Sequence, residues 1–364
     1  MMSTKHPRMM KLLSLALALV LIFSLAACSN GEAGNNAGQS DSQGEGQGGG
    51  QGESQSADGG DEGQGERTAV RVATLKGPTG MAMAKMMEDD AAGVSKNDYE
   101  FTVLGAPTDA AAMLTSGQAD IAGVPTNMAA NLYNKTEGKV TLININTLGV
   151  LYVLERGGET IQSIEDLKGK TVYSTGQGST PEYVFNYILR QNGLDPEKDL
   201  TVEYKGEHTE LAALLTAGEA DVAVLPQPFV TSVLTQNEDV HVVLDLTAEW
   251  EKVAGGDKPL AMGAAIVNTE FLKNNPQAVD DFLTELAVST AFVNENLEEA
   301  SVLIEKYDIM KAAVAKQAIP KCNMVFMSGQ EMKDGAESFL RVMRDADPAT
   351  VGGNLPDDGF YYVK

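Results

Sequence analysis

The sequence predicts an α/β fold made of two pseudo-duplicated lobes that face each other across a cleft. Three observations support this prediction. The 364 residues are enough for two cores, patterns typical of strands and helices alternate, and one block occurs twice at an offset of 101 residues. Residues 108–125 and 209–226 are identical at ten of 18 positions, and the same offset places Gly77 on Gly178. Two copies imply two similar lobes.

Each copy shows the same order of elements. In chain order these are a strand (69–75; 171–175), a Gly-containing loop, a helix (79–91; 181–191), a strand (100–104; 201–205), a short Ala/Leu helix that ends at a Gly, and a strand (120–124; 221–225). Strands that alternate with helices of this length predict a parallel sheet with helices on its faces.

Two extended stretches predict the strands that cross between the lobes. They cover residues 140–154, and 240–246 followed by 261–267, with crossings expected near 146–150 and 260–264. Residues 275–343 read as helical, because Pro276 suits a first turn and apolar residues then recur on one helical face. We therefore expect the first lobe at 67–148 and 262–364, including a C-terminal helical segment, and the second lobe at 149–261.

The N-terminal residues predict export and lipidation. Lys5, Arg8 and Lys11 precede an apolar run that ends in Leu-Ala-Ala-Cys28. This pattern is typical of a signal peptide over residues 1–27 and resembles a bacterial lipobox, which makes Cys28 the expected lipidation site. Residues 28–66 are rich in Gly and contain neither Lys nor Arg, so they predict a solvated tether between the lipid and the folded part.

Composition excludes several classes of function. There are 51 acidic and 27 basic residues, a formal net charge of -24, which disfavours nucleic acid as a partner. Two cysteines and three widely separated histidines make a multi-ligand metal site improbable. No arrangement of nucleophile, base or paired carboxylates stands out. We therefore predict a protein without enzymatic activity, cofactor or metal.

The candidate ligand contacts follow from the predicted topology. In an open parallel sheet, ligands bind beyond the carboxyl ends of the strands, where loops lead into helix N-termini. These N-termini carry unpaired N–H donors and suit an anion or a polar head group. The predicted contacts lie in these loops and on the first crossing: Lys76, Gly77, Thr79, Gly80, Met81, Thr126, Asn127, Asn146, Gly178, Ser179, Thr180 and Gln227.

Two alternatives remain open from the sequence. A heteroaromatic ligand such as a pyrimidine would require stacking on Tyr183 or Trp250, although Trp250 is expected to serve in packing. An enzyme on the same scaffold would require a titrating group in the cleft, for which Glu182, Glu207 and His208 are the candidates. For His208 a helix-capping role is the preferred interpretation.

These features together resemble the solute-binding lipoproteins of ABC importers. Asp-Leu-Lys-Gly-Lys170 followed by a strand and Gly-Gln-Gly-Ser-Thr-Pro181 is similar to the entry of the second lobe in the type II periplasmic-binding-protein fold. Ala-Asp120-Ile-Ala, Glu-Ala-Asp221-Val-Ala and Leu-Pro-Gln-Pro228 resemble the branch that binds nitrate, sulfonate, taurine and thiamine precursors.

The resemblance implies a function and its partners. It implies a monomeric protein outside the cytoplasm, anchored to the outer face of the plasma membrane through lipid on Cys28. Such a protein captures a small solute, with a sulfonate-, nitrate- or taurine-like anion favoured, by closing its two lobes about the crossings. It then delivers the solute to the permease and ATPase subunits of the importer.

Overall fold

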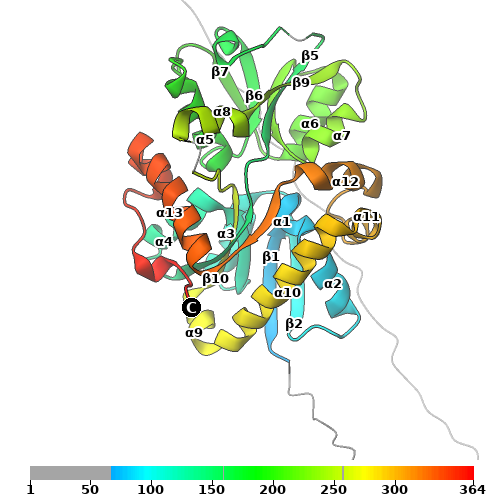
Figure 1. Ribbon diagram of the computed structural model, residues 1–364, viewed down its shortest axis with the longest axis vertical. Helices are drawn as coiled ribbons and strands as arrows, with labels where there is room; N and C mark the ends of the chain where they lie inside the picture. Colours follow the sequence, from blue (N-terminus) through cyan, green and yellow to red (C-terminus); the bar gives the residue numbers. More distant parts are fainter. Residues whose placement is uncertain (1–66, 159, 256–257) are drawn as a thin grey trace, which may run out of the picture. The chain divides into compact units, whose positions relative to one another are not determined.

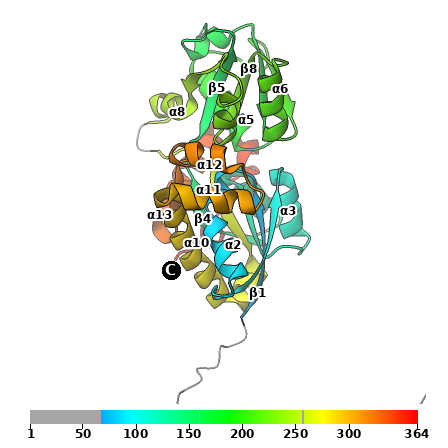
Figure 2. The same cartoon turned by 90° about the vertical axis from the view of Figure 1, so that its right-hand side faces the viewer.

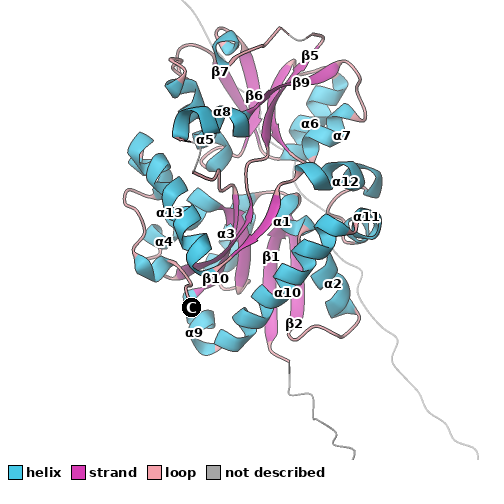
Figure 3. Ribbon diagram, viewed as in Figure 1, coloured by secondary structure: helices cyan, strands magenta, loops and turns pink. Residues whose placement is uncertain are grey.

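The computed structural model describes residues 67–364 except 159, 256 and 257. The predicted signal peptide, Cys28 and the tether lie outside the described residues. The described chain forms two sheets, each with helices packed on both faces (Figures 1 and 3). We call the parts built around the six-stranded and the five-stranded sheets the first and the second lobe.

The first lobe has the strand order β11-β4-β10-β3-β1-β2. Its strands are β1 (Ala69–Leu75), β2 (Asp98–Leu104), β3 (Ile121–Pro125), β4 (Val140–Thr147), β10 (Gly263–Asn268) and β11 (Met324–Met327). β1 pairs in parallel with β2 and β3, whereas β10 runs antiparallel to β3 and β4. Every residue of β3 is buried, as expected of a central parallel strand that is covered on both faces.

The helices of the first lobe cover both faces of its sheet. They are α1 (Pro78–Met81), α2 (Ala84–Ala91), α3 (Pro107–Thr115), α4 (Thr126–Lys135), α9 (Thr269–Asn274), α10 (Pro276–Glu295), α11 (Leu297–Lys306), α12 (Ala312–Ala318) and α13 (Gly329–Ala346). α2, α10, α11 and α12 share one apolar core, whereas α3, α4 and α13 belong to another. Figure 2 shows α3 and α10 on opposite sides of β1.

The second lobe repeats the arrangement of the first, with the strand order β7-β6-β8-β5-β9. Its elements are β5 (Leu151–Arg156), β6 (Thr171–Thr175), α5 (Thr180–Gln191), β7 (Thr201–Lys205), α6 (His208–Ala217), β8 (Val222–Pro226), α7 (Phe229–Leu234), β9 (Val240–Asp245) and α8 (Leu246–Ala254). The run β7-β6-β8-β5 corresponds to β2-β1-β3-β10, with an antiparallel fourth strand in both sheets. The predicted fold of two pseudo-duplicated lobes is therefore confirmed.

The chain passes twice between the lobes. It leaves β4 at Thr147 and enters β5 at Leu151, and it returns between the end of α8 at Ala254 and the start of β10 at Gly263. One apolar core includes residues of both sheets. In that core Trp250 of α8 packs against Phe339 of α13, with ring centroids 5.6 Å apart.

Several elements differ from the expectations. The helix predicted over 79–91 is two helices, because the regular helical hydrogen bonding is interrupted at Ala82 and Met83, although both residues keep right-handed helical dihedral angles. Helices α4, α7, α8 and α9 occupy stretches for which no element was predicted. The segment 275–343 is not entirely helical, because residues 324–327 form β11. Residues 324–327 are extended because they pair with β4. Such a tertiary contact cannot be predicted from the local sequence pattern.

Candidate functional site

A cavity of about 90 Å³ lies between the lobes at the carboxyl ends of their parallel strands. This is several times the space that one water needs. Its polar lining residues are Lys76, Thr79, Thr147, Thr175, Ser179, His208 and Gln227. Its apolar lining includes Leu75, Val124, Val150, Leu151, Phe229 and Met262. Both lobes therefore contribute to one site, as the topology of parallel sheets predicts.

The loops that follow β1 and β6 reach the cavity through turns that need glycine. Gly77 has φ of 130° and Gly176 has φ of 71°. Side chains with a Cβ rarely adopt such values, whereas glycine does so without steric cost. These two turns direct Thr79 and Ser179, at the starts of the following helices, toward the cavity.

Asn146 offers a donor beside the cavity floor. Its Oδ1 accepts hydrogen bonds from Thr79 Oγ1 at 3.2 Å and from Thr147 Oγ1 at 2.9 Å. The residue is fully buried, and its Nδ2 has no hydrogen-bond partner among the described residues. A buried donor without a partner costs about 1–3 kcal/mol. A ligand oxygen within reach of Nδ2 would recover that free energy.

Lys76 is the only charged side chain among the residues that line the cavity in the described part of the chain. Its Nζ lies 3.2 Å from Oδ2 of Asp308, whose side chain is 96% exposed. An ion pair with so exposed a partner contributes at most about 1 kcal/mol. The ammonium therefore remains available to an anion in the cavity.

His208 contributes a neutral imidazole. Its Nδ1 lies 2.6 Å from Thr175 Oγ1, and its ring packs against Phe229 with centroids 5.0 Å apart. Burial lowers the pKa of His208 to about 4, so the ring is uncharged at neutral pH. A neutral imidazole has one donor and one acceptor nitrogen. With Nδ1 bonded to Thr175, Nε2 is left for a ligand.

Gln227 completes the set of donors. Its Oε1 accepts from the backbone N and the Oγ1 of Thr231, at 3.2 and 2.8 Å. The carboxamide oxygen is thus used within α7, and Nε2 is the donor that remains. With Lys76 on the first lobe and Gln227 on the second, the cavity has N–H donors on both lobes and no lining carboxylate among the described residues. Nε2 of His208 is a further donor in the tautomer in which Nδ1 accepts from Thr175.

The structure brings five of the twelve predicted contacts to the cavity: Lys76, Gly77, Thr79, Ser179 and Gln227. The other seven do not line it, and they have contacts of other kinds. Met81 is fully buried in the core shared with α10. A Cβ on Gly80 would lie 2.3 Å from the carbonyl oxygen of Leu75. Gly178 donates its backbone N–H to Glu182, and Thr126 is fully buried.

Asn127 and Thr180 bond to each other across the lobes. Thr180 Oγ1 at the start of α5 donates to Asn127 Oδ1 at 2.7 Å, and both residues are fully buried. Asn127 Nδ2 donates to the carbonyl oxygen of Thr350 at 2.9 Å. These two side chains therefore join the lobes rather than line the cavity.

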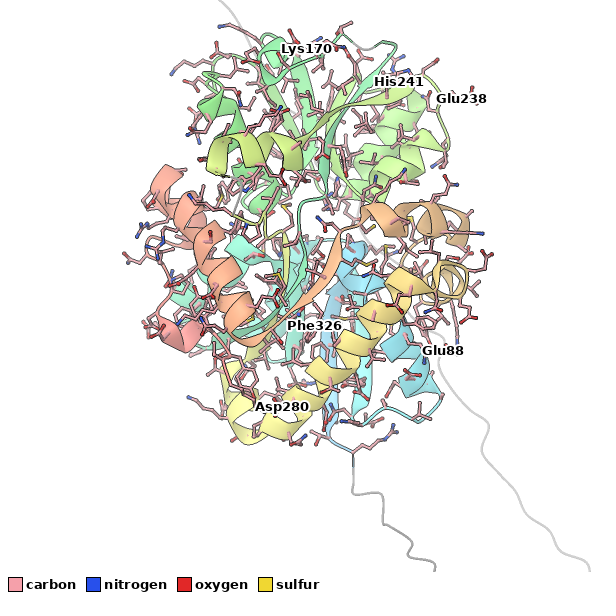
Figure 4. The ribbon with its side chains drawn as sticks, viewed as in Figure 1. Glu88, Lys170, Glu238, His241, Asp280 and Phe326 are labelled. Carbon is pink, nitrogen blue, oxygen red and sulfur yellow. The ribbon has the colours of Figure 1, made fainter. Side chains whose placement is uncertain are left out.

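Four further residues line the cavity and were not among the predicted contacts: Thr147, Thr175, His208 and Phe229. His208 was read as a helix cap, but the N-cap of α6 is Glu207 and His208 is the first helical residue. The sequence did contain a signal for a ligand contact at His208, because this residue lies in the loop that follows the second strand of a repeat. The other described histidine, His241, pairs with Glu155 in the sheet register and lies at the far end of the second lobe (Figure 4).

Of the described residues named for the two alternative functions, His208 alone lines the cavity. Trp250 is fully buried, and its Nε1 donates to the carbonyl oxygen of Lys258 at 3.0 Å. Neither Trp250 nor Tyr183 lines the cavity, so an aromatic ligand would find no stacking partner there other than Phe229 and His208. Glu182 and Glu207 do not line it either.

Among residues 67–158, 160–255 and 258–364, no group of three or more His, Cys, Asp or Glu is placed to hold a metal ion. In the same residues no helix is long and apolar enough to cross a bilayer.

Solved structures show the same fold. An ABC transporter protein from Parabacteroides distasonis is 27% identical, with a TM-score of 0.66 over 82% of this chain and 99% of that one. The periplasmic aliphatic sulphonate binding protein SsuA from Escherichia coli is 17% identical, with a TM-score of 0.64 over 81% and 92%. The periplasmic nitrate-binding protein NrtA from Synechocystis is 16% identical, with a TM-score of 0.58 over 79% and 84%.

The sequence itself matches a family model. Among curated proteins no sequence matches the chain. Residues 82–316, more than half of the chain, match the family described as ABC transporter, phosphonate, periplasmic substrate-binding protein. The resemblance predicted from the sequence is thereby confirmed, and the chain belongs to this family of substrate-binding proteins of ABC transporters.

Proposed function

We propose that the protein captures a small organic oxyanion, with a phosphonate or sulfonate head group, by closing its two lobes around the cavity. The observation that carries this proposal is the lining itself. It combines the Lys76 ammonium of the first lobe, the Gln227 amide donor of the second lobe, the hydroxyls of Thr79 and Ser179, and no carboxylate among the described residues. Charge-assisted hydrogen bonds of this kind favour an oxyanion over a neutral or cationic ligand.

Both lobes are needed for this binding mode. Lys76 and Thr79 belong to the first lobe, and His208 and Gln227 to the second. A solute that contacts both lobes binds the closed arrangement more tightly than an open one, and so shifts the population toward it. We infer that the lobes, with bounds at 67–148, 149–261 and 262–364, bend about the two connections. Release to a permease and its ATPase follows when the lobes reopen, and this sequence of events includes no chemical step.

The first test is thermal unfolding of the purified protein with phosphonates, sulfonates, inorganic phosphate, nitrate and pyrimidines. A ligand at 100 times its dissociation constant adds about 2.7 kcal/mol to the free energy of unfolding. We expect phosphonates or sulfonates to raise the melting temperature. A shift with pyrimidines alone would contradict the proposal.

A matched pair of variants tests the role of Lys76. Lys76→Met keeps most of the apolar stem and removes the charge, so we expect the oxyanion to bind about tenfold more weakly, a loss of about 1.4 kcal/mol. Lys252, which is paired with Glu249 on α8, lies outside the cavity, and Lys252→Met should bind like the parent protein. Small-angle scattering with and without the ligand tests closure, and an unchanged radius of gyration at saturation would exclude it.

A further inference from the structure

A second cavity of about 230 Å³ adjoins the first. Pro107, Gly176, Ser179 and Gly206 line both. We call the first the inner cavity and the second the outer compartment. Because four residues border both spaces, the outer compartment is the space next to the inner cavity into which a substituent on the ligand would have to extend.

The walls of the outer compartment come from both lobes. Ala106, Thr108 and Met128 lie on the first lobe, and Gln177, Tyr204 and Lys205 lie on the second. Burial raises the pKa of Tyr204, and the neighbouring Glu182 carboxylate raises it further, so the phenol stays neutral. The walls therefore suit a short carbon chain with a polar end.

Among the described residues, Lys205 is the only charged residue that lines the outer compartment. Lys76 has the same position in the lining of the inner cavity. Its Nζ lies 5.2 Å from the ring centroid of Tyr173 and 3.8 Å from Oε2 of Glu203. The Glu203 side chain is 48% exposed, and an ion pair at that distance contributes little. To bind an anionic group in the outer compartment, the Lys205 ammonium would exchange these two weak contacts for one with the ligand.

One lysine belongs to each lining, Lys76 of the first lobe to the inner cavity and Lys205 of the second lobe to the outer compartment, and no carboxylate among the described residues lines either space. We propose that the ligand is a short-chain organic anion with two acidic groups, a phosphonate or sulfonate head in the inner cavity and a carboxylate beside Lys205 in the outer compartment. This inference rests on the proposed function, whose head group it retains.

A ligand with two acidic groups can be distinguished by its charge and length from a bare oxyanion and from an oxyanion whose chain ends in an ammonium. A bare oxyanion would leave Lys205 without a partner from the ligand. A chain that ends in an ammonium would place like charges together in a partly desolvated space, which is unfavourable. A terminal carboxylate would gain a charge-assisted contact there.

Calorimetric titration of the full protein tests this inference with methylphosphonate, phosphonoacetate, 3-phosphonopropionate and 2-aminoethylphosphonate, and with their sulfonate counterparts. We expect the better of the two carboxylate-bearing phosphonates to bind at least about tenfold more tightly than the aminoethyl compound. Lys205→Met should reduce that preference to about twofold or less and leave methylphosphonate binding unchanged within about twofold. Lys198, exposed and paired with Asp195, provides the matched control Lys198→Met, which should keep the full preference.

The comparison of ligands on the parent protein does not depend on how the variants fold. Binding of methylphosphonate or 2-aminoethylphosphonate as tight as that of the carboxylate-bearing compounds would overturn this inference and leave the proposed function in place. An unaltered preference in Lys205→Met would also overturn it. If none of the phosphonates or sulfonates binds, the proposed function fails and this inference fails with it.

Discussion

At the scale of single residues, His208 shows how burial prepares a side chain for binding. The ring is enclosed between Thr175 and Phe229, with its Nδ1 hydrogen-bonded. Burial in this position disfavours the charged imidazolium, which lowers the pKa to about 4. The ring is therefore a fixed neutral hydrogen-bonding group rather than a proton carrier.

The low pKa of His208 predicts a pH dependence of stability. The pKa is about 6.5 in the unfolded chain and about 4 in the folded one, so the unfolded state takes up the proton first as the pH falls. The free energy of unfolding should decrease between pH 6.5 and 4, by up to about 3 kcal/mol from this residue. Denaturant unfolding at pH 7 and pH 5 should show a smaller decrease in His208→Gln than in the parent protein. The control is His241→Gln, and equal decreases in all three proteins would contradict the prediction.

Gly80 was predicted as a ligand contact, but the structure shows that close packing against the backbone requires glycine at this position. A Cβ at this position would lie 2.3 Å from the carbonyl oxygen of Leu75, a backbone atom that cannot turn aside. We expect Gly80→Ala to lower the free energy of unfolding by about 2 kcal/mol or more. Gly158, where a Cβ would meet only the Thr160 methyl group at 3.7 Å, gives the control Gly158→Ala with a small effect. Chemical denaturation of both variants decides between the two expectations.

At the scale of the elements, the repeat predicted the order of strands and helices because both copies obey the same periodicities. The loops that reach the cavity were predictable for the same reason, since parallel strands end at one edge of a sheet. The direction in which each side chain points was not predictable from the repeat. Thr79 and Met81 are two residues apart, about 200° around a helix, so one faces the cavity and the other the core. Thr180 likewise turns to Asn127, a contact that no local pattern announces.

Helix α4 joins the C-terminal segment to the second lobe. Asn127, Asn131 and Asn134 are spaced on one helical face. Their amide nitrogens donate to backbone carbonyls of residues 349–354, and Asn127 also accepts from Thr180 of the second lobe. The contact of α4 with the second lobe is thus held in place by the segment that follows α13.

This arrangement predicts a variant that changes affinity without changing selectivity. Asn127 lines neither the inner cavity nor the outer compartment, so Asn127→Ala removes a contact of the closed lobes and no contact with the ligand. We expect all ligands to bind about fivefold more weakly, a loss of about 1 kcal/mol. Asn131, whose amide lies 3.5 Å from the carbonyl oxygen of Ala349, gives the control Asn131→Ala with little effect. Titration with two ligands checks the result, and a changed ratio of affinities would place Asn127 in contact with the ligand.

At the scale of the whole molecule, the net charge bears on the lipid anchor that the sequence predicts at Cys28. Family membership places the protein outside the cytoplasm, and the full chain carries a formal net charge of -24. An anionic membrane surface repels such a body, and no polybasic segment is present after the first dozen residues to offset this. Electrostatic adsorption therefore cannot hold the protein at a membrane, whereas a lipid on Cys28 would.

The anchor is tested by comparing the parent protein with Cys28→Ser in membrane fractions. We expect the parent protein to sediment with membranes and to stay bound in 1 M salt, because high salt screens charge interactions and leaves acyl chains inserted. Cys28→Ser should lose the sedimenting fraction or accumulate as the unprocessed precursor, and labelled palmitate should mark only the parent. Cys322 is buried, and burial raises the pKa of its thiol to about 12, so Cys322→Ser serves as the control that keeps its label. Release of the parent protein by salt, or labelling that survives in Cys28→Ser, would show that the protein is held at the membrane by another means.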